Sequence, residues 1–259
     1  MKFYIGVDCE GVACGVGAPG GSLNASRNVD FCRRQATREA NAAATALFDA
    51  GATEVIVWDN HGGSLNLDYE QLDRRCRIAL GASVDHRWPG IDDSFAGVLF
   101  IGYHAMEGTR AAPMCHTFSS EVFGGMWING RAVGELAIDA AVAGEVGVPP
   151  IFVASDDKAV AEARDFFGEI QTVTTKIGTG WNGAISEHPL AVLDTIAGGV
   201  KRAVERLGEA RPFHFDPPLE YDLKFKRMDA AEGWARRSAG ELVDAFTVRQ
   251  HADSILELF

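Results

Sequence analysis

Apolar and polar positions follow two different rhythms in the first 60 residues. Residues 2–7 and 53–58 are short apolar runs rich in β-branched and aromatic side chains, a pattern typical of strands buried on both faces of a parallel sheet. Between them, residues 28–50 place apolar side chains at intervals of three to four, as on one face of a helix. Gly51 follows where helices commonly end. This pattern predicts a β-α-β unit with parallel strands and a right-handed crossover.

Strand and helix patterns continue to alternate until about residue 207. The further runs with strand character are 98–101, 151–154 and 170–176. Those with helical spacing are 134–146, 156–167 and 190–207. Such alternation predicts an α/β fold, with an open, mainly parallel sheet covered by helices on both faces.

The pattern changes near residue 210. Prolines at 212, 217 and 218 interrupt the chain, and residues 219–226 then alternate between apolar and polar. A period of two indicates a strand with one solvated face, as in an antiparallel sheet. We therefore predict two parts, an α/β core over residues 1–210, which would carry the metal-binding catalytic site, and a smaller C-terminal α+β lobe over residues 211–259.

Charge and composition narrow the class of partner. The chain has 24 basic and 36 acidic residues, a net charge of −12, and no basic run, so nucleic acid is not an expected partner. No apolar stretch approaches the roughly 20 residues that cross a bilayer, and we expect no membrane partner. The first ten residues do not resemble a signal peptide. Five cysteines without a CxxC pair indicate reduced thiols, and hence a cytoplasmic protein.

Metal-ligand side chains follow three of the predicted strands. Asp8 and Glu10 come after the first, His61 after the second and His104 after the third. Ligands of open α/β sheets bind beyond the carboxyl ends of the strands, and positions i and i+2 of an extended segment point the same way. Two close carboxylates repel each other unless a cation lies between them. With imidazoles added, this ligand set favours zinc or another transition metal over magnesium.

Each of these residues alone has an ordinary explanation, as a solvated loop carboxylate, a helix cap or a hydrogen-bonded histidine. Their convergence at one sheet edge is what predicts a site. Two further candidates are His116, in a polar loop, and Glu135, at a helix start, where a carboxylate also interacts favourably with the helix dipole.

Other signals are interpreted as structural. Asp156 and Asp157 follow a strand but also begin a helix, so we interpret them as capping residues. Residues 15–20 match GxGxxG, but the match does not lie between a strand end and a helix start, and Pro19 interrupts it. We expect no dinucleotide cofactor.

Five segments resemble, in order and spacing, the D-aminopeptidases of the DppA type, a zinc peptidase family of bacteria and archaea. They are VDCEG at 7–11, WDNH at 58–61, GYHAM at 102–106, MCH at 114–116 and VGEL at 133–136. The resemblance is strong from residue 1 to about residue 165 and weaker through the C-terminal lobe.

The resemblance implies a site with two zinc ions per subunit, in which Asp8 is the bridging ligand and His116 takes the position of the nucleophile. It also implies a ring-shaped homodecamer with active sites facing an inner channel, which releases N-terminal D-residues from short peptides. The implied metal ligands are Asp8, Glu10, His61, His104 and Glu135.

Two points stay open at this stage. An imidazole at position 116 could attack the substrate directly, act as base on a water, or donate to the oxyanion. Where relatives often carry a Ser-Arg pair, this chain has Gly-Trp-Asn at 180–182. An arginine there could bind a substrate carboxylate. Trp181 either lines the substrate pocket and changes its preference, or packs in the core or at a subunit contact.

The leading hypothesis is a zinc-dependent aminopeptidase that hydrolyses the N-terminal peptide bond of short peptides containing D-amino acids, at a two-metal site. One alternative is a magnesium-dependent phosphohydrolase, because DCEG at 8–11 resembles the DxDG of the haloacid-dehalogenase group. That group has Asp where this chain has Glu10, and it has no use for two histidines. The other alternative is a non-catalytic, ring-forming binding protein stabilised by metal.

Overall fold

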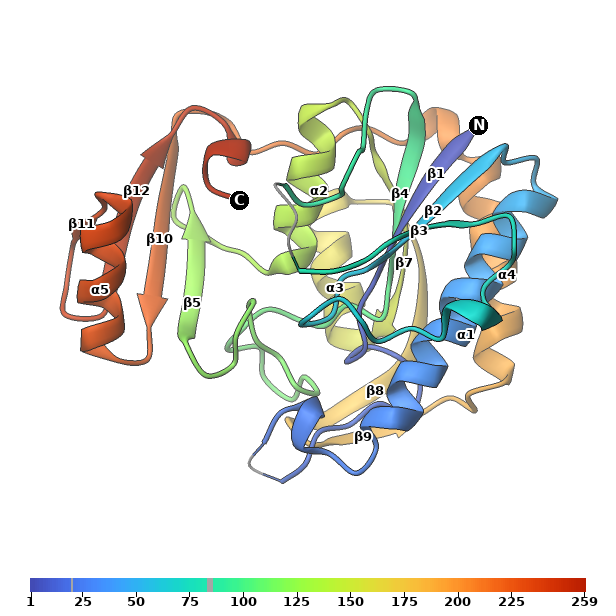
Figure 1. Cartoon of the computed structure of the whole chain (residues 1–259), viewed down its shortest axis with the longest axis horizontal. Helices are drawn as coiled ribbons and strands as arrows, with labels where there is room; N and C mark the ends of the chain where they lie inside the picture. Colours follow the sequence, from blue (N-terminus) through green and yellow to red (C-terminus); the bar gives the residue numbers. More distant parts are fainter. Residues whose placement is uncertain (20, 83–85) are drawn as a thin grey trace.

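The computed structural model describes residues 1–19, 21–82 and 86–259. In this part of the chain the strands form two sheets (Figure 1). Gly20, the last glycine of the GxGxxG match, lies outside the described residues. The larger sheet has the strand order β3-β2-β1-β4-β7-β8-β9. Its strands are β1 (Lys2–Val7), β2 (Glu54–Asp59), β3 (Arg77–Ala79), β4 (Phe95–Ile101), β7 (Pro150–Asp156), β8 (Gln171–Gly180) and β9 (Gly183–Ser186). All neighbours in it are parallel except β8 and β9.

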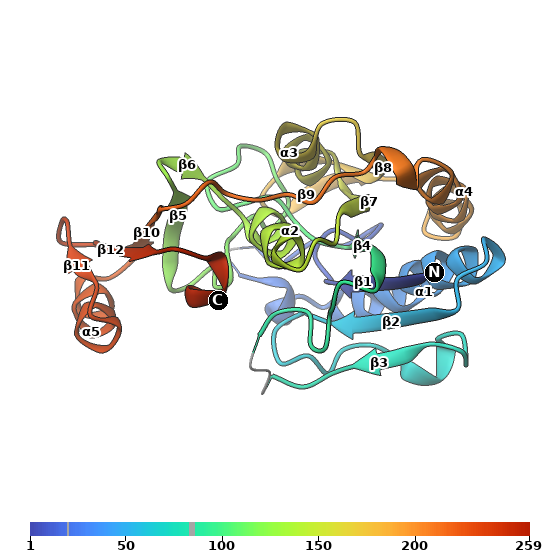
Figure 2. The same cartoon turned by 90° about the horizontal axis from the view of Figure 1, so that it is seen from above.

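Helices cover both faces of this sheet, as predicted. Phe3, Ile5 and Val7 of β1 pack with α1 and α4, whereas Tyr4 packs with α2 and α3, and Figure 2 shows the two pairs of helices on opposite sides of the strands. Because both faces are buried, the apolar run of β1 is continuous. The helices are α1 (Val29–Asp49), α2 (Glu135–Glu145), α3 (Asp157–Phe167) and α4 (Ala191–Glu205), with 3₁₀ turns at η1 (Leu23–Ala25), η2 (Tyr69–Gln71), η3 (Leu207–Glu209) and η4 (Ile255–Glu257).

The second sheet is antiparallel, with the strand order β11-β12-β10-β5-β6. The alternation after residue 218 is confirmed as strand β10, whose apolar residues are buried. The remaining elements of this part are β5 (Phe123–Ile128), β6 (Arg131–Ala132), β10 (Leu219–Phe225), α5 (Met228–Ser238), β11 (Glu241–Leu242) and β12 (Thr247–Ala252).

Strand β5 comes from the middle of the chain and pairs with β10. Its sequence gives little strand signal, because Gly124 and Gly125 occupy two of its six positions. A domain boundary near residue 210 stays a prediction. Any division of the chain there has to assign β5 and β6 to the sheet of residues 211–259, since they are hydrogen-bonded to it.

Two smaller predictions can be compared with the structure. The Asp156 carboxylate caps α3, accepting hydrogen bonds from the backbone N–H of Lys158 (2.8 Å) and Ala159 (3.1 Å), which confirms its capping role. Among the described residues, no helix combines the length and the hydropathy needed to span a bilayer.

The register of the central strands brings their carboxyl ends together. Val7 of β1 pairs with Asp59 of β2 on one side and with Ile101 of β4 on the other. The chain therefore leaves all three strands at the same level, and the following loops pack backbone against backbone. A Cβ atom on Gly11 would overlap the carbonyl oxygen of Tyr103 and the hydroxyl of Ser155.

We expect Gly11→Ala to lower the free energy of unfolding by about 3 kcal/mol, because neither neighbour is the free end of a flexible side chain and the loop would have to move. Urea unfolding measures this difference. Gly208→Ala is the matched control, since a Cβ there has no atom within 4 Å. Equal unfolding midpoints for the two variants would show that the loop packing is loose.

Candidate metal centre

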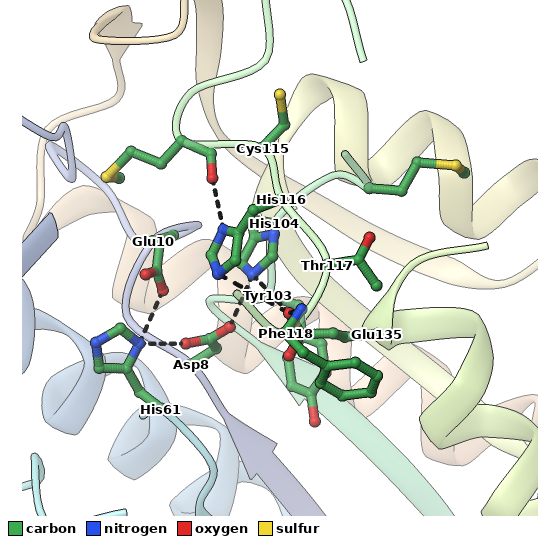
Figure 3. A network of polar contacts seen from close by, with 12 residues as sticks. Asp8, Glu10, His61, Tyr103, His104, Cys115, His116, Thr117, Phe118 and Glu135 are labelled. Atoms are coloured by element: carbon green, nitrogen blue, oxygen red, sulfur yellow. Dashed lines mark hydrogen bonds and ion pairs between the residues drawn. The ribbon is translucent and has the colours of Figure 1, made fainter. Parts of the chain in front are cut away.

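One half of the site is built from the ends of β1 and β2. His61 Nδ1 lies 2.8 Å from Asp8 Oδ1 and 3.0 Å from Glu10 Oε2 (Figure 3). Asp8 Oδ1 also accepts a hydrogen bond from the backbone N–H of Cys9 at 2.8 Å. The Cys9 side chain packs away from the site in the core beside α1. The i, i+2 prediction is therefore confirmed, because Asp8 and Glu10 reach the same imidazole while Cys9 does not.

The other half brings in the end of β4 and the start of α2. His104 Nε2 lies 3.4 Å from Asp8 Oδ2 and 3.3 Å from Glu135 Oε1. Glu135 is the first residue of α2, and its Oε1 also accepts the backbone N–H of Phe118 at 2.7 Å. The two oxygens of Asp8 thus face different histidines, His61 and His104, so that Asp8 connects the two halves.

His116 completes the cluster. Its ring stacks on that of His104, with centroids 3.9 Å apart and planes 14° apart, and its Nε2 lies 4.0 Å from Glu135 Oε1. His116 Nδ1 is 2.8 Å from the carbonyl of Met114, and His104 Nδ1 is 3.1 Å from that of Ala105. A carbonyl can only accept, so each Nδ1 carries the hydrogen. In the neutral rings both Nε2 atoms therefore present lone pairs toward the carboxylates.

A positive charge beside Asp8 and Glu10 stabilises their buried carboxylates. Burial alone raises the pKa of Asp8, but the hydrogen bond from His61 and the charges of His61 and His104 outweigh it and hold that pKa well below its usual range. Burial lowers the pKa of His61, but Glu10 and Asp8 more than offset this and raise it to about 11. In the absence of a cation, protons on His61 and His104 supply this charge.

The residues present fit a metal site. His61 Nε2 is buried with no hydrogen-bond partner among the described residues, and Glu10 Oε2 has only its close approach to His61 Nδ1. Buried polar atoms of this kind are costly unless another group satisfies them. Two groups of possible ligands overlap at His104, and within each group the ligand atoms lie within 4.8 Å of one another. The groups are Asp8, Glu10 and His104, and His104, His116 and Glu135. Carboxylates mixed with imidazoles suit zinc.

A cavity of about 210 Å³ opens onto this cluster. Asp8, Glu10, His61, His116 and Glu135 are among the residues that line it, together with residues 118–121. The His116 side chain is 16% exposed, whereas that of His104 is 2% exposed. His116 is therefore the histidine of the stacked pair that a molecule in the cavity would meet.

A buried network behind the site was not predicted. The Tyr103 hydroxyl donates to Asp139 Oδ2 at 2.7 Å, and Asn60 Nδ2 donates to the Tyr103 oxygen at 2.9 Å. Arg87 donates to Asp139 Oδ2 at 2.8 Å and to Asn60 Oδ1 at 3.0 Å. The network holds the residue before His61, and it depends on contacts between distant segments that leave no local pattern in the sequence.

Of the two interpretations of Trp181, packing is confirmed. Its indole N–H donates to the carbonyl of Cys115 at 3.2 Å, and its own carbonyl accepts the N–H of Met114 at 2.8 Å. Trp181 packs against the apolar cluster of Ala105 and Cys115, and it is not among the described residues that line the cavity. It therefore supports the loop that carries His116.

The structure does not favour the phosphohydrolase alternative, because the two carboxylates that would form its second acid pair are engaged in other contacts. Asp156 Oδ1 is engaged in capping α3, as described above, and Asp157 accepts hydrogen bonds from Lys158 Nζ (2.6 Å) and the Gly178 N–H (2.8 Å). Both oxygens of Asp157 and Oδ1 of Asp156 thus have structural partners, and the histidines that this alternative does not use lie at the centre of the site.

A buried acid close to the His104 loop has a testable effect on stability. Glu162 of α3 accepts the N–H of Met106 at 2.8 Å, and burial raises its pKa to about 7 although that hydrogen bond opposes the shift. Between pH 4.5, the ordinary pKa of a glutamate, and pH 7, the folded protein therefore keeps a proton on Glu162 that the unfolded chain has lost. The contribution of protonated Glu162 to the free energy of unfolding is complete below pH 4.5 and is lost as the pH rises through 7.

We expect Glu162→Gln to raise the free energy of unfolding by about 3 kcal/mol at pH 8 and by much less at pH 5, because glutamine carries no charge to bury. Urea unfolding at the two pH values measures this. Glu257→Gln, at an exposed position, is the control and is expected to change little. A difference from the unmutated protein that is the same at both pH values would contradict the assignment.

Comparison with known proteins gives one consistent result. A family model described as D-aminopeptidase matches residues 1–259. A D-aminopeptidase of Bacillus subtilis (strain 168) is 38% identical over 181 residues, which are 68% of this chain and 64% of that relative, so the match spans less than two thirds of its length. A solved structure, described as the Zn-dependent D-aminopeptidase DppA from Bacillus subtilis, a self-compartmentalizing protease, superposes with a TM-score of 0.91 at 30% identity over 99% of this chain and 93% of that one.

Proposed function

The chain belongs to the D-aminopeptidase family, and from this premise we propose that it is a zinc-dependent aminopeptidase that hydrolyses the N-terminal peptide bond of short peptides. One observation carries the proposal. Side chains from the ends of three strands, one loop and one helix start converge on a single small cavity, with carboxylate oxygens and imidazole nitrogens 2.8 to 3.4 Å apart.

We assign two zinc ions to the site, with Asp8 as the ligand they share. This is supported by its two oxygens, which face His61 on one side and His104 on the other. Glu10 would complete the first set with His61, and Glu135 the second with His104. When bound, such ions polarise the scissile carbonyl and stabilise the negative charge that develops on its oxygen.

His116 is the proposed catalytic residue, because it lines the cavity and its Nε2 faces Glu135. Since Nδ1 donates to the Met114 carbonyl, the neutral ring has no hydrogen on Nε2 to give to an oxyanion. The geometry therefore favours His116 as an acceptor of the proton of an attacking water, or as the attacking group itself. Once protonated, the ring would be stabilised by the carbonyl on one side and the Glu135 carboxylate on the other.

The substrate we propose is a short peptide with a D-residue at its N-terminus. The cavity volume of about 210 Å³ suits a small molecule rather than a folded protein. The D-preference rests on membership of the family and on the relatives described above.

Metal analysis of the purified protein, combined with a screen of dipeptides carrying L- or D-residues at the N-terminus, tests the proposal. We expect two zinc ions per chain and turnover of D-amino-terminal dipeptides. Hydrolysis confined to phosphate esters in the presence of magnesium would overturn it, and bound zinc without any hydrolysis would favour the non-catalytic binding protein.

We also propose that the chain self-associates, and specifically that it forms a ring-shaped decamer. The related structure described as self-compartmentalizing supports self-association. Light scattering tests the decamer, whose mass would be ten times the 27.8 kDa of one chain.

A cytoplasmic location is proposed because all five cysteines are free thiols, and cell fractionation tests it.

A further inference from the structure

Two neighbouring side chains at the end of β8 hold the backbone of the loop that carries Glu10. The Thr175 hydroxyl donates to the carbonyl of Gly11 at 2.6 Å. The Lys176 ammonium donates to the carbonyl of Glu10 and, at 2.8 Å, to that of Val12. Three consecutive carbonyls of the loop thus receive hydrogen bonds from two consecutive residues, 164 to 166 positions further along the chain.

A shift in strand register explains how adjacent residues reach the same loop. Along β8, Thr174 pairs with Ser155 of β7, but Lys176 pairs with Asp156, so that Thr175 is an extra residue. Successive side chains of a regular strand point to opposite faces, and an extra residue interrupts that alternation. The burial pattern changes at the same place, because Thr175 and Lys176 are both buried.

The ammonium of Lys176 is in an unusual environment. The side chain is 1% exposed, and its hydrogen-bond acceptors among the described residues are backbone carbonyls. Burial lowers its pKa, while the nearby charges of Asp156 and Glu39 act to retain the proton. Burying an ammonium group is costly, and its hydrogen bonds to the carbonyls of Glu10 and Val12 offset part of that cost.

The loop is also fixed from its other sides. The N–H of Gly11 donates to the carbonyl of Gly102 at 2.7 Å, and the N–H of Ala13 donates to Glu39 Oε1 at 2.9 Å. The part of the loop that Lys176 holds is the part from which the Glu10 side chain extends toward His61.

We propose that Lys176 is a positioning residue of the metal centre, which presents the Glu10 carboxylate beside Asp8 by holding the carbonyls of Glu10 and Val12. The inference rests on the proposed zinc function. Lys176 lies behind the loop and is not among the residues that line the cavity, so it acts through Glu10 and contacts neither metal nor substrate. Partners of this kind commonly contribute 10- to 100-fold to metal affinity.

The test is Lys176→Met, which keeps most of the side-chain length and removes the donors. Zinc affinity is measured by competition with a chromogenic chelator on metal-free protein, and the stability of the same metal-free protein is measured by urea unfolding. We expect zinc binding to weaken by roughly 10- to 100-fold. At saturating zinc, we expect kcat to fall while KM changes little.

Two further variants make the result decisive. Thr175→Val is nearly isosteric and removes only the hydroxyl that holds Gly11, so it should fold and weaken zinc binding by a smaller factor. Lys158→Met, at a partly exposed position of α3, is the control and should bind zinc as the unmutated protein does.

If Lys176→Met binds zinc as tightly as the unmutated protein does, the inference is overturned, even if the variant is less stable. That pattern would indicate a purely structural role for Lys176. If Lys176→Met does not fold, unchanged zinc affinity in Thr175→Val overturns it instead. An unmutated protein that binds no zinc would overturn the proposed function itself, and the inference with it.

Discussion

Replacing Asp8 with alanine is expected to release zinc and to reduce peptide hydrolysis by more than about 1,000-fold. Each carboxylate oxygen of Asp8 faces a different imidazole, so its removal takes a ligand from both proposed metal positions at once. His104→Ala is expected to have a similar effect. His104 is the residue common to the two groups of possible ligands.

Elemental analysis of the purified variants, together with dipeptide hydrolysis, measures this prediction. Asp253→Ala, which changes an exposed carboxylate, is the control and should retain both zinc and activity. Circular dichroism would establish that the variants are folded. Unchanged zinc stoichiometry in both Asp8→Ala and His104→Ala would refute the assignment of the metal site.

Replacing His116 with alanine is expected to reduce hydrolysis by about 100- to 10,000-fold while both zinc ions remain bound. His116 lines the cavity, and its Nε2 is 4.0 Å from Glu135, further than the 3.3 Å between His104 and the same oxygen. Removing it takes away a proton acceptor or nucleophile and leaves the five proposed ligands in place.

The zinc content of His116→Ala separates catalysis from ligation. Loss of one zinc ion would identify His116 as a ligand, in agreement with its place in a possible ligand group, and would contradict the catalytic role. Activity equal to that of the unmutated protein would exclude both roles. His251→Ala, at an exposed position, controls for the loss of an imidazole.

Much of the larger sheet was predictable from the sequence. The strand at residues 2–7 was predicted with the bounds of β1, and the helix predicted at 134–146 differs from α2 by one residue at each end. Strand β1 is buried on both faces and helix α2 on nearly every side, so both appear in the sequence as mainly apolar runs. Strand β5 was missed, because its two glycines remove the side chains on which such a pattern depends.

The candidate site was only partly predictable. Asp8, Glu10, His61 and His104 could be grouped, because each follows a strand and parallel strands end at one edge of the sheet. Lys176 could not be connected with them. In the sequence it stands at the end of a predicted strand, and its role depends on the extra residue in β8 and on the loop passing over the ends of β4 and β7.

The sequence by itself determined the α/β fold, the sheet edge that carries the site and the chemical types of the ligands, because hydrophobic periodicity and the residues that follow each strand are local properties of the chain. Tertiary structure alone decided that Asp8 faces two histidines, that His116 stacks on His104 with its Nε2 toward Glu135, and that Lys176 holds the loop of Glu10. These features depend on distances of a few ångströms between segments far apart in sequence, and such distances are set by how loops, strands and helices pack together.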